Sequence, residues 1–151
     1  MRTARAQAEL VLTPEAALRL WSDVSRWPSF VEGFARALER DPDWPGKGAK
    51  FVWESTPAGR GRVTEKVLDS EGPDRFVTRV FEDRLTGTQT FRVVESEAGS
   101  RAELSLEYKL TKYGALSAVA DAIFIRRAIR DSLRRTLFRF AVEAEEEAGL
   151  R

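Results

Sequence analysis

The sequence predicts an α+β fold, in which a seven-stranded antiparallel sheet is combined with two short helices after the first strand and a long C-terminal helix. Three observations indicate this. A helix-start triplet, Thr13-Pro14-Glu15, lies close to the N-terminus. Turn-forming residues then recur at the eight- to twelve-residue spacing typical of an antiparallel meander. Beyond Gly114, apolar residues recur at helical spacing.

The first strand is expected at residues 8–12, directly before the first helix. Thr13 can cap free backbone amides, Pro14 stands where its missing N–H costs nothing, and Glu15 suits the positive end of a helix. One face of this helix is apolar, formed by Ala17, Leu18 and Trp21. Asp23 ends the helix, and Ser25 is the expected cap of a second short helix over residues 26–31.

Six further strands are expected between Gly33 and the last helix, at residues 34–40, 50–54, 62–69, 76–82, 89–95 and in a final strand that ends at 110. A turn at Thr86-Gly87 is expected to precede the fifth of these. The final strand has the clearest pattern, since apolar and polar residues alternate strictly: Leu104, Leu106, Tyr108 and Leu110 against Glu103, Ser105, Glu107 and Lys109. This alternation indicates a sheet with one buried face and one face in water.

The last helix is expected from Gly114 to about residue 148, with Gly149 as its end. Its apolar stripe is formed by Ile125, Ile129, Leu133, Leu137 and Phe140. The length of 151 residues fits one domain, so residues 1–151 are predicted to form a single domain.

The composition excludes several kinds of chemistry. The chain has no cysteine, which excludes disulfides and thiolate metal sites, and no histidine, which excludes a Ser-His-Asp triad. Any proton transfer must therefore use Asp, Glu, Tyr, Lys or ordered water. No metal and no cofactor is expected. With 25 basic and 24 acidic residues, the net charge of +1 gives no overall reason to expect a specific nucleic-acid partner.

Neither end of the chain predicts a membrane or export segment. Residues 1–9 carry two arginines and no long apolar stretch, unlike a secretory signal. Apolar runs in the last helix are interrupted by Asp121 and by Arg126-Arg127, far short of the roughly 20 residues that a membrane span needs. We therefore expect a cytoplasmic protein without a membrane span.

Two stretches of the chain carry distinctive motifs: Thr13-Pro14-Glu15, Trp21-Ser22-Asp23 and Trp27-Pro28-Ser29-Phe30 at the start, and Tyr113-Gly114, Asp121, Arg126-Arg127 and Leu133-Arg134-Arg135-Thr136-Leu137 at the end. Together with the order of elements, these motifs resemble the START-like, or Bet v 1-like, superfamily, and within it the polyketide cyclase/dehydrase and coenzyme Q-binding (SRPBCC) branch. The resemblance implies a helix-grip fold with a cavity between the concave sheet face and the terminal helix. It says little about function, because such a fold serves many functions.

The candidate ligand-binding residues are inward-facing apolar side chains of the sheet and of the helices: Trp27, Phe30, Phe51, Trp53, Phe91, Val93, Leu104, Leu106, Tyr108, Ile129, Leu133 and Leu137. Each could equally be part of an ordinary core. Tyr108 could anchor a ligand through its hydroxyl or bond to backbone instead. Arg62 and Glu65 have opposite phases on one strand, so at most one of them faces inward. An inward carboxylate would have a raised pKa and could act as acid or base, but we favour a solvent-facing Glu65 on the convex side.

Six arginines form a basic segment of the last helix: Arg126, Arg127, Arg130, Arg134, Arg135 and Arg139. It could contact anionic lipid or RNA. We favour a solvated face in which Asp131 pairs with Arg127 and Arg135, and Glu143 with Arg139, at helical spacing.

The first functional hypothesis is a carrier or sensor that binds a hydrophobic small molecule such as a lipid, a quinone or a polyketide-like aromatic. The second is a polyketide aromatase/cyclase or dehydratase-type enzyme, whose chemistry depends on shape and proximity and therefore does not require histidine. The third is a coenzyme Q-binding-like or ribosome-associated interaction protein that uses the arginine-rich helix as its contact surface.

Overall fold

The computed structural model describes residues 2–57, 59–111 and 118–149. Its elements in chain order are β1 (Arg2–Leu10), α1 (Pro14–Ser22), the 3-10 turn η1 (Val24–Arg26), α2 (Trp27–Phe30), β2 (Phe34–Arg40), β3 (Lys50–Ser55), β4 (Arg62–Asp69), β5 (Arg75–Phe81), β6 (Leu85–Ser96), β7 (Gly99–Leu110) and α3 (Ala118–Glu147). The predicted α+β helix-grip architecture is confirmed. Gly114 and the side chain of Asp121 lie outside the described part of the chain.

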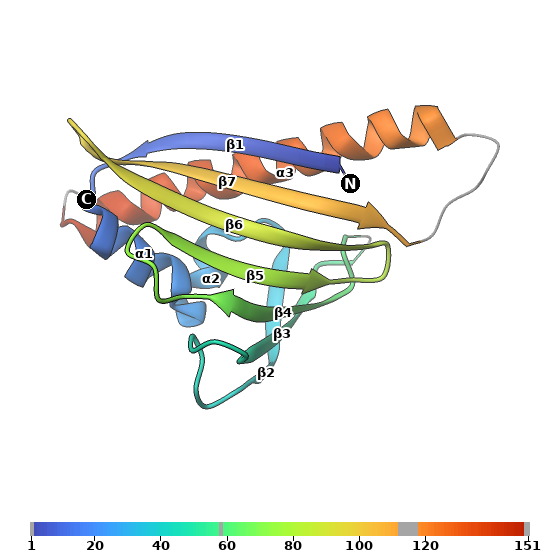
Figure 1. Cartoon of the computed structure of the whole chain (residues 1–151), viewed down its shortest axis with the longest axis horizontal. Helices are drawn as coiled ribbons and strands as arrows, with labels where there is room; N and C mark the ends of the chain where they lie inside the picture. Colours follow the sequence, from blue (N-terminus) through green and yellow to red (C-terminus); the bar gives the residue numbers. More distant parts are fainter. Residues whose placement is uncertain (1, 58, 112–117, 150–151) are drawn as a thin grey trace.

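The seven strands form one antiparallel sheet in the order β1-β7-β6-β5-β4-β3-β2. The first strand therefore joins the last strand, and Ala4 lies opposite Leu106. Figure 1 shows the sheet curving strongly, with α3 running alongside β1 and β7 and with α1 and α2 near the C-terminal end of α3. One sheet face is thus covered by helices, and the buried side chains of the strands point toward them.

The local signals at the first helix act as expected. Thr13 Oγ1 accepts a hydrogen bond from the backbone N–H of Ala16 at 3.3 Å, and Pro14 is the first helical residue.

The cap of the turn that follows the first helix differs from the prediction. Asp23, not Ser25, caps the following turn, because its carboxylate accepts both the backbone N–H and the hydroxyl of Ser25. A carboxylate is the stronger acceptor here because it carries charge.

The turn expected at Thr86-Gly87 lies earlier in the chain. The chain reverses at residues 82–85, where the N–H of Glu82 donates to the carbonyl of Leu85 at 3.0 Å, and Gly87 is inside β6. A Cβ at Gly87 would lie 2.6 Å from the carbonyl oxygen of Glu107. The glycine is therefore required by close packing on β7 rather than by a turn.

Aromatic rings fill the half of the interior beside α1 and α2. Trp21 stacks on Phe91 with ring centroids 4.4 Å apart, and Phe140 of α3 contacts Trp21, Phe30 and Phe91 edge-on. A second group of rings surrounds Phe51, consisting of Trp27, Phe34 and Trp44. This half of the concave face is packed as a solid core, which confines open space to the other half. No described helix is long and apolar enough to cross a membrane.

Candidate functional site

A cavity of about 240 Å³ lies between the sheet and the N-terminal half of α3. Its sheet wall is formed by β6 and β7, where Leu85 pairs with Leu110 and Gln89 with Leu106. Its helix wall consists of side chains three, four or seven residues apart, which share one face of α3: Phe124, Ile125, Ala128, Ile129, Ser132 and Leu133. Because Phe124 lines the cavity and is 75% exposed, the cavity opens to solvent beside it.

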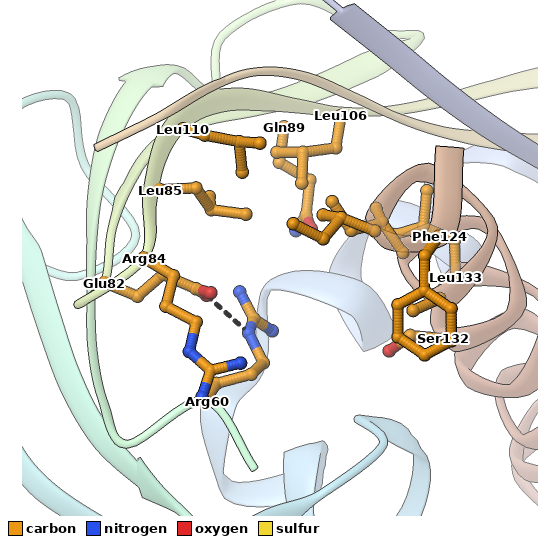
Figure 2. Close-up of a pocket in the computed structure, with 13 residues that line it drawn as sticks. Arg60, Glu82, Arg84, Leu85, Gln89, Leu106, Leu110, Phe124, Ser132 and Leu133 are labelled. Carbon is orange, nitrogen blue, oxygen red and sulfur yellow. Dashed lines mark hydrogen bonds and ion pairs between the residues drawn. The ribbon is translucent and has the colours of Figure 1, made fainter. Parts of the chain in front are cut away.

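The polar end of the cavity comes from two loops. Arg60 precedes β4, and Glu82 and Arg84 lie between β5 and β6. Arg60 Nε donates to Glu82 Oε2 at 2.6 Å, as drawn in Figure 2. The guanidinium of Arg60 also lies over the ring of Trp53, 5.1 Å from its centroid. The apolar side chains of Leu85, Leu110 and Leu133 surround the rest of the space (Figure 2).

Glu65 lies behind this polar end and is only 3% exposed. Its carboxylate accepts hydrogen bonds from Trp53 Nε1 at 3.1 Å and from Thr78 Oγ1 at 3.0 Å. Burial raises the pKa of the Glu65 carboxyl above its ordinary value, and the nearby positive charge of Arg60 opposes this shift. A buried acid of raised pKa is a candidate proton donor or acceptor.

The expectation that Glu65 faces solvent on the convex side is wrong. Glu65 alternates with Val63 and Val67, both fully buried, so all three point to the concave face, whereas Arg62 is exposed. Burial of the carboxyl is tolerated because β3 and β5 each provide a hydrogen-bond donor. Those donors are distant in the sequence, so the pattern of β4 alone does not indicate them.

Of the sequence-derived ligand-binding candidates, Leu106, Ile129 and Leu133 line the cavity. The others are buried outside its lining: Trp27, Phe30, Phe51, Trp53, Phe91, Val93, Leu104, Tyr108 and Leu137. Trp27 packs on Phe51, Phe91 packs on Phe140 of α3, and Trp53 supports Arg60 and Glu65.

Leu85, Gln89, Leu110 and Ile125 line the cavity although they were not among the predicted site residues. Leu110 has the same phase as Leu106, and Ile125 belongs to the apolar stripe of the last helix, so both carried a usable signal. Nothing in the sequence pattern indicated that the charged loop residues Arg60, Glu82 and Arg84 would line the cavity. Their approach to the cavity depends on how β5 turns into β6.

The arginine-rich segment of α3 makes different ion pairs from those expected. Asp131 lies 3.9 Å from Arg130 and Arg134, and Arg135 pairs with Glu32 at 2.6 Å. Glu143 is buried and pairs with Arg26 at 2.9 Å rather than with Arg139. The pairs expected for Arg135 and Glu143 were wrong because residues outside α3 bind these side chains instead: Glu32 binds Arg135, and Arg26 binds Glu143. Within the described residues, no group of three or more acidic side chains is placed to hold a metal ion.

A protein-family model described as polyketide cyclase/dehydrase and lipid transport matches residues 1–145. Among solved structures, TTHA0849 from Thermus thermophilus has 16% identity and a TM-score of 0.76, covering 97% of this chain and 99% of that chain. The di-domain ARO/CYC StfQ of the steffimycin biosynthetic pathway has 16% identity and a TM-score of 0.75, covering 97% of this chain and 51% of that chain.

A third solved structure, CV1439 from Chromobacterium violaceum, has 18% identity and a TM-score of 0.67, covering 94% of this chain and 96% of that chain. At such low identities these structures establish the shared fold alone. No curated protein matches the sequence.

Proposed function

The chain belongs to the polyketide cyclase/dehydrase and lipid transport family, and we propose that it binds a hydrophobic small molecule in the cavity between its sheet and α3. The cavity is the observation that carries this proposal. Its volume of about 240 Å³ equals that of about eight water molecules at ~30 Å³ each. Apolar side chains form most of its wall, so an apolar guest releases poorly bonded water there.

The expected affinity is modest. Each buried CH₂ group contributes about 0.8 kcal/mol, whereas association costs about 4 kcal/mol or more in lost freedom of motion. For a ligand that fits wholly inside the cavity, the favourable free energy of burial therefore exceeds the cost of association only slightly. A longer ligand can extend out of the cavity through the opening beside Phe124 and bury more of its apolar surface against that ring. We predict that the function is exerted in the cytoplasm, which cell fractionation would check.

Native mass spectrometry of freshly purified protein, followed by solvent extraction, tests the proposal. We expect a co-purified apolar molecule, and we expect Ser132→Trp to displace it by filling the cavity from α3. Arg134→Trp is the matched control, since Arg134 is exposed on the same helix and does not line the cavity. Equal ligand occupancy in Ser132→Trp and in the unchanged protein would contradict this site.

Cyclase- or dehydratase-type chemistry is a second candidate, favoured by the inward, desolvated Glu65. A protonated carboxylic acid held near neutral pH can serve as a general acid, and its ionised form as a general base. Glu65 lies next to the charges of Arg60 and Glu82, which line the cavity. Glu65 itself does not line the cavity, so this chemistry requires that a bound carbonyl compound reach the carboxyl.

Hydrogen–deuterium exchange next to the carbonyl of octan-2-one, followed by NMR in heavy water, tests this second candidate. Acid–base chemistry at Glu65 requires that the protein accelerates the exchange and that Glu65→Gln abolishes the acceleration. Glu95→Gln is the matched control, because Glu95 is exposed at the end of β6. Exchange no faster than in buffer alone would exclude the chemistry for this probe class, and binding alone would stand.

A further inference from the structure

The charged end of the cavity has an unequal number of positive and negative side chains. Two arginines, Arg60 and Arg84, and one carboxylate, Glu82, line it. The neighbouring Asp83 lines a different groove with Arg62 and Phe81 and not this cavity. By this count, the charged residues of the lining carry one excess positive charge, at one end of a largely apolar cavity.

Arg84 supplies the excess. Among the ion pairs of the described residues none involves Arg84, and its side chain is exposed. Figure 2 shows Arg84 and Arg60 on the same side of the cavity, opposite the α3 residues Phe124 and Leu133. The backbone carbonyl of Arg84 accepts the N–H of Thr111 at 2.9 Å, which fixes this loop against the end of β7.

Arg60 also has hydrogen-bond donors that its ion pair with Glu82 does not use. Its ion pair with Glu82 uses Nε at 2.6 Å, and within the described residues no hydrogen bond from its two terminal nitrogens is formed. A guanidinium has five N–H donors in a planar fork that matches the oxygens of a carboxylate or phosphate. Packing of Arg60 over Trp53 and its bond to Glu82 hold that fork in place.

We propose that the ligand is an amphipathic anion, with one carboxylate or phosphate group bound by Arg84 and Arg60 and an apolar chain extending along Leu85, Leu106 and Leu133. This inference rests on the proposed binding function and specifies its ligand class. A cationic head group would be repelled by the excess positive charge, and a neutral one would leave that charge unbalanced.

Titration calorimetry with four probes of equal chain length tests the inference: octanoate, octyl phosphate, octan-1-ol and octylammonium. We expect at least one anion to bind about tenfold more tightly than octan-1-ol, a difference of about 1.4 kcal/mol, and octylammonium to bind most weakly. The tighter anion of the two tells a carboxylate from a phosphate ligand. We expect Arg84→Gln to weaken binding of the anion about tenfold, so that the anion loses its advantage over octan-1-ol.

Arg92→Gln is the matched control, because Arg92 is an exposed arginine of β6 outside the cavity lining. Equal affinity of the unchanged protein for octan-1-ol and both anions would overturn the inference while leaving the proposed binding function intact. An equal loss of anion binding in Arg84→Gln and Arg92→Gln would overturn it too, since it would indicate a general charge effect. Failure of all four probes to bind would refute the proposed binding function itself, and the inference with it.

Discussion

Replacement of Glu65 by glutamine should stabilise the protein at neutral and alkaline pH. Glu65 is 3% exposed, and burial raises the pKa of its carboxyl above the ordinary value of 4.5. Glutamine has nearly the same shape and no charge. Its carbonyl oxygen can accept from Trp53 Nε1, and its amide can donate to Thr78 Oγ1, so both buried hydrogen bonds are kept.

The size of the effect follows from proton linkage. Below pH 4.5 the carboxyl is protonated in both the folded and the unfolded chain, and its titration costs nothing. As pH rises above 4.5, the unfolded chain releases the proton while the folded chain retains it. The free energy of unfolding therefore falls by up to about 1.4 kcal/mol per pH unit until the pKa of the folded state is passed. Because glutamine does not titrate, the Glu65→Gln variant does not lose stability in this way.

Urea unfolding of both proteins from about pH 4 to about pH 9 measures the difference directly. Other carboxylates titrate equally in both proteins, so the difference in unfolding free energy isolates Glu65. We expect the two proteins to be within about 1 kcal/mol of each other near pH 4, comparable to one net hydrogen bond. Above about pH 5 the variant should gain steadily, with a melting temperature higher by about 2–4 °C per kcal/mol. Glu95→Gln, an exposed change on β6, should show no such trend.

A difference that stays flat with pH would refute the reasoning. So would a growing advantage of the unchanged protein as pH rises. That second outcome would mean that Arg60 and the two hydrogen bonds stabilise an ionised carboxylate more than burial destabilises it.

Two further substitutions test the packing on either side of the cavity. Phe140→Ala should lower the free energy of unfolding by about 3–5 kcal/mol in denaturant melts, because Phe140 is fully buried among Trp21, Phe30 and Phe91; a loss under about 1 kcal/mol would contradict this packing. Gly87→Ala should cost about 1–3 kcal/mol, because the added carbon would lie 2.6 Å from a backbone oxygen of β7. An unchanged stability there would contradict the close approach of β6 and β7.

The order of elements was predictable because each rests on a local signal. Thr13 and Pro14 mark a helix start, and strict alternation around Leu106 marks a half-buried strand. Local signals gave wrong predictions where a residue type is compatible with more than one structural role. Gly87 was interpreted as a turn residue, although it is required by close strand packing. Ser25 was interpreted as a cap, although the adjacent Asp23 is the better acceptor.

The site was predictable only in part, because a cavity is what remains after the side chains pack. The sequence indicates that Phe91 and Leu106 both face inward, but not that Trp21 and Phe140 close over Phe91 and leave Leu106 beside open space. The orientation of Glu65 was likewise hidden, since its strand carries apolar residues on both faces. Its partners come from two other strands.

Methyl NMR during a titration with octan-1-ol tests the central claim most directly, because it places an apolar guest inside the fold. The account predicts that methyl signals of Leu85, Leu106 and Ile129, which line the cavity, shift and saturate together. Signals of Leu10 and Leu20, buried outside the lining, should stay in place. Saturable shifts confined to residues outside the lining, or no shifts at all, would contradict the account.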